Sequence, residues 1–185
     1  IRTRLVGSEM CIRDRNFKYQ WSEESSDQTY VGLSDASFNQ NAHERYGLSK
    51  YDNMDNDHDT LSLNYVLDVG DFEFSLTAYQ NDFARNWFKV DKIDNKKVYG
   101  IGNGINNIIG AANEGNSDAI AILNGNNAEA VEIKLKNNNR AYESEGIDFR
   151  GSWSNDMHNI TFGYRDTKDS EDRMQWYATA DWMGG

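Results

Sequence analysis

The clearest pattern along the chain is a strict alternation of apolar and polar residues between positions 60 and 89. Its apolar members are Leu61, Leu63, Tyr65, Leu67 and Val69 on one arm, and Phe72, Phe74, Leu76 and Ala78 on the other. A period of two places one set of side chains on each face of a β-sheet. Only Gly70 and Asp71 separate the arms, which suits a two-residue turn. The sequence therefore predicts a hairpin with one apolar face, in which Asn64 lies opposite Thr77 on the polar face.

A second hairpin is predicted near the C-terminus. Its apolar positions are Ile147, Phe149, Gly151 and Trp153 on one arm and Ile160, Phe162 and Tyr164 on the other. A four-residue loop over residues 154–157 would place Phe149 opposite Phe162. Residues 16–22 read as the tail of an earlier strand, because Phe17, Tyr19 and Trp21 share one face.

Long polar stretches connect these strands. Residues 23–59, 91–140 and 167–173 are rich in polar residues and are predicted as loops, with a short helix or a short strand over residues 119–123. Long and short connections thus alternate, as they do in outer-membrane barrels with short periplasmic turns and long extracellular loops. A connection of this length is unusual inside a compact soluble domain.

Strand length favours a membrane barrel over a soluble sheet. The apolar alternation covers residues 61–69, whereas soluble strands average about 5–6 residues and tilted membrane strands need about 9–11. The tryptophans Trp21, Trp87, Trp153 and Trp176 are candidates for aromatic belts at the membrane interfaces, or for ordinary packing. We predict an all-β fold, namely a partial transmembrane antiparallel β-barrel. The alternative is a secreted or surface β-sandwich that binds carbohydrate or protein, in which a second sheet would cover the apolar face.

Composition narrows the function classes. The formal net charge is −11 and only 38% of the residues are hydrophobic, so no basic surface for nucleic acid is expected. No apolar run reaches the about 18 residues of a transmembrane helix. Cys11 is the only cysteine, which excludes a disulfide framework and a thiolate metal site.

The N-terminus differs from the rest of the chain. The segment LVGSEMCIRDR, residues 5–15, resembles a translated sequencing-adapter read-through. Residues 1–15 are therefore expected not to belong to the fold, and residues 16–185 are expected to be a fragment of a barrel domain. The chain starts without Met, in keeping with a piece of a longer protein.

Several stretches together suggest a family. Residues 30–65 and 74–90 resemble the β-barrel of TonB-dependent outer-membrane receptors, in particular ferric dicitrate receptors, and residues 136–149 and 158–176 resemble the next strand pair and loop. The resemblance implies a many-stranded barrel around a plug, in the outer membrane of a Gram-negative bacterium. It implies uptake of iron chelates, ferric citrate or siderophores, with energy from a TonB complex. Without the plug and its coupling region, this stretch is expected not to transport anything.

Three arginines are candidate ligand-binding residues. Arg85 has the parity of Glu73, and Arg140 has the parity of Asp148, so both are predicted to face the lumen. With Arg45 from the first long connection, they would hold an anionic chelate through charge-assisted, bidentate contacts. The alternative is that these arginines pair with local acids and hold the loops together.

Other stretches do not match a metal-binding, nucleotide-binding or catalytic motif. The acidic run at residues 51–59 lacks the Gly and the terminal Glu of a calcium loop and is predicted as a solvated loop. Residues 100–110 are Gly-rich, lack a dinucleotide-binding pattern and are predicted as a flexible loop. The histidines are scattered. We therefore expect no catalytic residues, no metal and no cofactor, and a polysaccharide-acting enzyme, the third possibility, lacks a recognisable acid pair.

Overall fold

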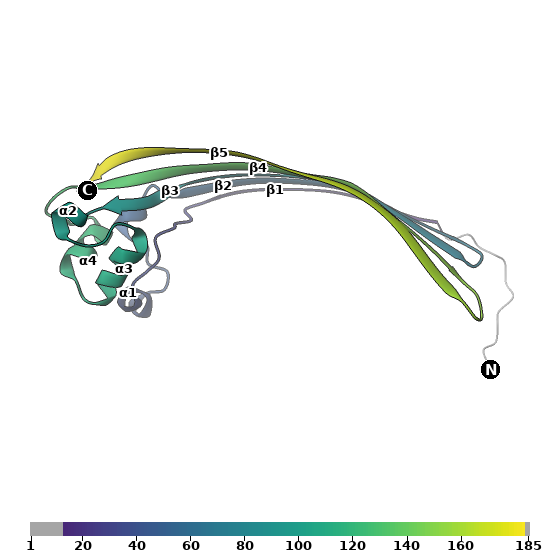
Figure 1. Ribbon diagram of the computed structural model, residues 1–185, viewed down its shortest axis with the longest axis horizontal. Coiled ribbons are helices and arrows are strands. Elements are labelled where there is room, and N and C mark those ends of the chain that lie inside the picture. Colours follow the sequence, from purple (N-terminus) through teal and green to yellow (C-terminus); the bar gives the residue numbers. More distant parts are fainter. Residues whose placement is uncertain (1–12, 184–185) are drawn as a thin grey trace. The chain divides into compact units, whose positions relative to one another are not determined.

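The computed structural model describes residues 13–183, which form a five-stranded sheet and four short helices (Figure 1). The strands are β1 (Arg13–Ser26), β2 (Asn53–Val69), β3 (Phe72–Asp94), β4 (Val131–Ser154) and β5 (Asn159–Trp182). They follow one another in the sheet in chain order, with β1 and β5 at the edges. The predicted all-β class is confirmed. None of the helices in this part of the chain is both long and apolar enough to cross a membrane.

The chain divides into two compact units. The first unit comprises Ile1–Ser22, Asp57–Phe83 and Ala141–Asp172, and its described part consists of strands and their tight turns. The second unit comprises Glu23–Asn56, Ala84–Arg140 and Arg173–Gly185, and it contains the remaining strand segments and all helices. Residues 13–15 of the expected N-terminal artefact begin β1, and its other residues lie outside the described part.

The first predicted hairpin is confirmed. β2 ends at Val69 and β3 begins at Phe72, so Gly70 and Asp71 form the turn. Gly70 has φ +59°, a left-handed conformation that glycine adopts without steric cost. The Thr77 hydroxyl donates to Asn64 Oδ1 at 2.8 Å, as expected for residues directly opposite one another.

The second hairpin forms with a different register. Phe162, predicted to face Phe149, lies over Gly151 instead, and Arg165 pairs with Asp148. The reason is a tighter turn at residues 155–158, which Asn155 Oδ1 closes by accepting hydrogen bonds from two following backbone amides. The shift is two residues, so each side chain keeps its predicted face.

The strands extend into stretches predicted as loops. Two of the three predicted loops, residues 23–59 and 91–140, are shorter than expected. The first runs only from the end of β1 at Ser26 to the start of β2 at Asn53, and the second from the end of β3 at Asp94 to the start of β4 at Val131. The third, residues 167–173, is not a loop, because it lies inside the continuous strand β5. In these stretches both faces carry mostly polar side chains, so the alternation disappears from the sequence. The backbone groups still pair with neighbouring strands, because ladder hydrogen bonds do not depend on side-chain polarity.

The remaining connections are folded and enclose a small core in the second unit. The helices are α1 (Asp35–Gln40), α2 (Lys96–Tyr99), α3 (Ile105–Asn113) and α4 (Ser117–Asn124), with a single 3-10 turn, η1 (Gly47–Ser49). The stretch predicted as a flexible loop, residues 100–110, instead leads into α3. Ile105, Ile108 and Ala112 of this helix recur at helical spacing and are buried. Residues 119–123, left open between helix and strand, lie in α4.

Gly146 gives a stability prediction for the first unit. A Cβ at this position would lie 2.8 Å from Tyr79 Oη and 2.9 Å from two ring carbons. We expect Gly146→Ala to lower the free energy of unfolding by about 1–3 kcal/mol, because the ring must leave its place. Urea unfolding of both variants checks this. Gly32→Ala, where nothing lies within 4 Å, is the control, and an equal loss in both would contradict the packing argument.

Candidate functional site

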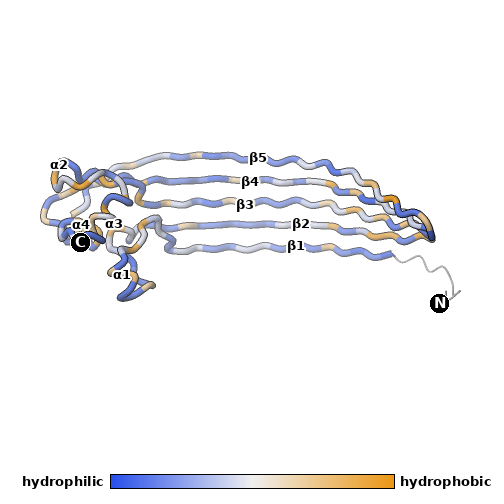
Figure 2. The backbone as a smooth tube through the Cα atoms, turned by 60° about the horizontal axis from the view of Figure 1, so that its bottom comes forward, coloured by the Kyte–Doolittle hydropathy of each residue, from blue (hydrophilic) through white to orange (hydrophobic). Residues whose placement is uncertain are grey.

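The first unit has an exposed apolar face. Five of the residues on this face are between 41% and 50% exposed to solvent: Leu61 (41%), Leu63 (44%), Phe72 (45%), Ile147 (50%) and Phe162 (50%). Figure 2 shows hydrophobic and hydrophilic residues alternating along the strands near the two tight turns. Because the described part of this unit is a single sheet, no second layer within it covers these side chains. A contiguous exposed surface of this kind indicates contact with an apolar partner.

Aromatic residues of β1 extend the apolar face. The guanidinium of Arg15 lies over the Tyr65 ring at 5.8 Å, which places the odd-numbered residues of β1 beside the apolar residues of β2. Phe17, Tyr19 and Trp21 share this parity, and their exposed fractions are 70%, 59% and 64%.

The other three tryptophans considered for the aromatic belts have different packing partners. Trp153 contacts Phe72 in the first unit, and Trp176 contacts Phe88 in the second. Trp87 has the parity of the polar face, and its indole donates to Gln28 O at 3.0 Å. Trp87 therefore does not occupy the belt position considered for it.

The apolar face has a defined height. The alternation from Leu61 to Val69 extends about 27 Å along the strand at about 3.4 Å per residue. At a tilt of about 40° this corresponds to about 20 Å along a membrane normal, comparable with the apolar band of about 25 Å in membrane barrels. Beyond it, the same face becomes polar, with Asp59, Gln80 and Glu145 at the next positions of β2, β3 and β4.

The opposite face of the first unit is polar and internally paired. Arg165 Nε donates to Asp148 Oδ2 at 2.6 Å, and Thr77 bonds Asn64. Near the end of this face, Phe83 lies between two rings. Its centroid is 5.9 Å from that of His58 and 6.0 Å from that of Tyr142.

The second unit brings two of the predicted arginines together. The stacked Phe83 and Tyr142 and the hydrogen bond from Ser154 N to Asp71 O fix the pairing of β3 with β4. Two residues further along each strand, this register places Arg85 directly opposite Arg140 on the polar face. Both side chains are half-buried, and Arg85 Nε is buried without a hydrogen-bond partner.

A third arginine continues the row onto β5. Asn138 Oδ1 accepts from Gln175 Nε2 across the strands and from Arg140 Nε at 3.3 Å. Two residues before Gln175 and two after Asn138, the same pairing places Arg173 beside Arg140. Neighbouring antiparallel strands lie about 5 Å apart, so the three guanidinium groups form one cross-strand row.

Lysines extend this row into a cationic face, by which we mean Arg85, Arg140, Arg173, Lys89 and Lys136. Lys136 and Lys134 lie over the Tyr177 ring at 5.5 Å and 4.3 Å. Lys136 also acts electrostatically on Lys89, in agreement with their opposed positions. These five side chains form a local concentration of cations in a chain whose net charge is −11.

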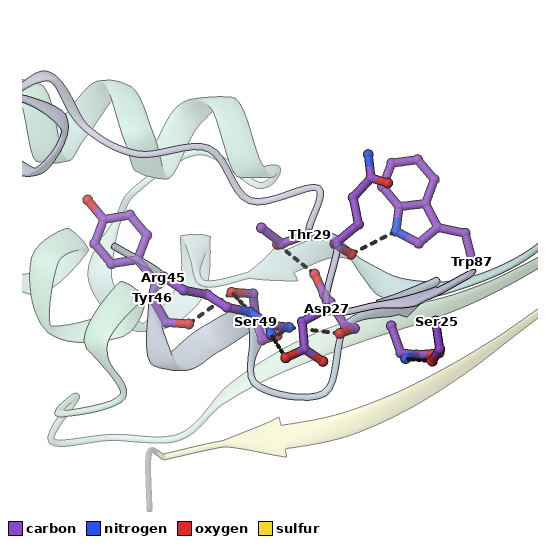
Figure 3. Close-up of polar contacts among 10 residues, drawn as sticks. Ser25, Asp27, Thr29, Arg45, Tyr46, Ser49 and Trp87 are labelled. Carbon is purple, nitrogen blue, oxygen red and sulfur yellow. Dashed lines mark hydrogen bonds and ion pairs between the residues drawn. The ribbon is translucent and has the colours of Figure 1, made fainter. Parts of the chain in front are cut away.

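The third predicted arginine has a different role. Arg45 forms an ion pair with Asp27 at 3.2 Å and donates to the carbonyl oxygens of Ser49 and Asp52 (Figure 3). These contacts all lie within the connection between β1 and β2. The structure therefore brings Arg85 and Arg140 together and uses Arg45 to hold a connection in shape.

Asp52 is the buried acid of this region. Its side chain accepts from Thr29 Oγ1 at 2.7 Å and from Val90 N at 2.9 Å, and the residue is 1% exposed. Burial raises the pKa of the Asp52 carboxyl, while these hydrogen bonds and Arg45 act in the opposite direction. Asp52 belongs to the acidic run that lacks a calcium motif. Residues 53–59 of that run, predicted as a loop, belong to β2.

Sequence reasoning missed Lys89, Lys136 and Arg173. The sequence signal for these residues was the same parity that identified Arg85, but Lys136 and Arg173 lie in stretches that lack hydrophobic alternation and were predicted as loops.

Within residues 13–183, no group of three or more His, Cys, Asp or Glu residues is placed to hold a metal ion. In the comparisons with known proteins, no protein-family model and no curated protein matches the chain.

Proposed function

We propose that the chain is part of the barrel wall of an outer-membrane TonB-dependent receptor that takes up iron chelates. The observation that carries this proposal is the exposed apolar face of the first unit, opposite a polar and internally paired face. A membrane strand pair needs this arrangement, because one face meets hydrocarbon and the other meets water. A β-sandwich would need a second sheet over Leu63 and Phe72, and the described residues form one sheet.

The cationic face supports an anionic ligand. Guanidinium groups bind carboxylate and phosphate oxygens bidentately, and a row of them suits a ligand with several anionic groups. Ferric citrate and carboxylate siderophores have this chemistry. The ligand would lie on the face of the second unit that carries these cations.

Partitioning tests the membrane part of the proposal. The full chain, refolded from urea in the presence of phosphatidylcholine vesicles, is expected to float with the vesicles in a density gradient. Protease protection of the first unit would then indicate insertion. A chain that stays monomeric in buffer and does not float would overturn the proposal in favour of the sandwich.

Charge reversal tests the ligand part. We expect the double variant Arg85→Glu, Arg140→Glu to lower affinity for ferric citrate by at least about tenfold, equivalent to about 1.4 kcal/mol, because attraction becomes repulsion. Isothermal titration calorimetry on the full chain measures this. Lys92→Glu is the matched control, since Lys92 is exposed and has the opposite parity on β3. Unchanged affinity in the double variant would remove both arginines from the site.

A further inference from the structure

The ammonium group of Lys89 lies in an aromatic cage. Its Nζ is 3.4 Å from the ring centroid of Tyr30 and 4.1 Å from that of Trp87, and the residue is only 7% exposed. The two rings are nearly perpendicular, with an angle of 81° between their planes. Cation–π attraction is strongest when the cation is desolvated. Tyr30 comes from the connection after β1, whereas Trp87 and Lys89 come from β3, so the cage joins the two.

Hydrogen bonds fasten the same connection to the same strand. Trp87 Nε1 donates to Gln28 O, and Thr29 Oγ1 donates to Asp52, whose carboxylate also receives Val90 N. Figure 3 shows the hydrogen bonds of Thr29 and Trp87. Residues 28–31 are therefore held against β3 by these polar contacts and by the caged cation, and Val31, which is 4% exposed, also packs in the hydrophobic core of the second unit.

The charges around Lys89 belong partly to the cationic face. Burial lowers the pKa of the Lys89 ammonium, and Lys136 and Arg85 lower it further, while Asp91 and Asp52 act in the opposite direction. Lys136 lies on β4, and Arg85 and Asp91 lie on β3. Asp52 is the residue immediately before β2. Repulsion from Lys136 and Arg85 therefore disfavours the positive charge of the Lys89 ammonium in the cage.

We propose that Lys89 couples anion binding on the cationic face to the ordering of residues 28–31. An anion held by Arg85 and Lys136 offsets their repulsion of Lys89, so the ammonium stays in the Tyr30–Trp87 cage and the connection stays docked. Coupling is reciprocal, so the docked connection raises anion affinity by the same factor. This inference rests on the proposed anion site and adds its regulation.

Hydrogen exchange of the full chain, with and without ferric citrate, tests the coupling. In the unsubstituted chain the anion is expected to slow exchange of the amides of residues 28–31. Lys89→Met keeps the length of the side chain and removes the charge. It is expected to abolish this slowing and to lower anion affinity by at least about fivefold. Lys92→Met, on the other face of β3, is expected to change neither.

A second pair of variants separates coupling from simple destabilisation. Tyr30→Phe keeps the ring and is expected to keep the anion-dependent protection, whereas Tyr30→Leu is expected to lose it. Binding without any change in protection, or equal changes in the unsubstituted chain and Lys89→Met, would overturn the coupling and leave the anion site intact. No binding by the unsubstituted chain would overturn both.

Discussion

Replacing Leu63 by arginine is expected to destabilise the vesicle-inserted chain by roughly 2 kcal/mol or more, within the about 2–4 kcal/mol found for arginine near the bilayer midplane. Leu63 lies on the apolar face, inside the nine-residue alternation of β2. Its side chain would meet hydrocarbon, where a guanidinium loses hydration and finds no counter-charge. The neighbouring residue, Asn64, lies on the polar face and bonds Thr77. Asn64→Arg is therefore expected to cost much less.

Urea titration of both variants in phosphatidylcholine vesicles, followed by tryptophan fluorescence, measures the difference. The pair is well matched, because the two positions are adjacent in one strand and lie on opposite faces. In buffer, Leu63 is already 44% exposed, so a soluble sheet would tolerate the substitution within about 0.5 kcal/mol. Equal effects of the two substitutions in vesicles would therefore argue against contact with lipid.

Replacing Trp182 by alanine is expected to lower the free energy of unfolding of the second unit by about 3–5 kcal/mol. Trp182 is 5% exposed and belongs to the core that α3 and α4 form with the strand ends. Its indole Nε1 donates to Ile122 O at 2.9 Å, at the last turn of α4. The substitution removes buried ring surface and also leaves that carbonyl without this donor.

Trp176→Ala provides the control for this effect. Trp176 lies on the same strand, contacts the ring of Phe88 and is 46% exposed. Its loss is expected to cost far less, because exposed surface contributes little to folding. Urea unfolding followed by hydrogen exchange of the α3 and α4 amides separates the two variants. Similar losses of protection in both would show that Trp182 does not anchor the helices.

Strand β3 contributes to a different surface in each of the two units. On β3, Phe72 and Phe74 present apolar surface, whereas Arg85 and Lys89 on the same strand belong to the cationic face. Within each unit, the residues of β3 with even numbers and those with odd numbers point to opposite sides. A change of parity in this strand would therefore disturb both surfaces at once.

The sequence by itself determined the hairpins, their faces and the parity of Arg85 and Arg140. These features depend on local rules: side chains alternate in a strand, and Gly70–Asp71 allows one tight turn. The sequence also identified Leu63 and Phe72 as members of one apolar face. The exposure of that face followed only from the structure, because a sequence does not show what covers a surface.

Tertiary structure alone decided the length of the strands, the helical connections and the composition of the cationic face. Lys136 and Arg173 lie in stretches where both faces are polar, so only backbone pairing with neighbouring strands makes them β-structure. The register of β4 with β5 depended on Asn155, whose side chain closes the turn. Lys89 and Tyr30 are far apart in sequence, and their contact depends on how the first connection folds back onto β3. Long-range pairing, which no local pattern encodes, is the physical reason for the strand lengths and for the contact between Lys89 and Tyr30, whereas the register of β4 with β5 depends on a local turn.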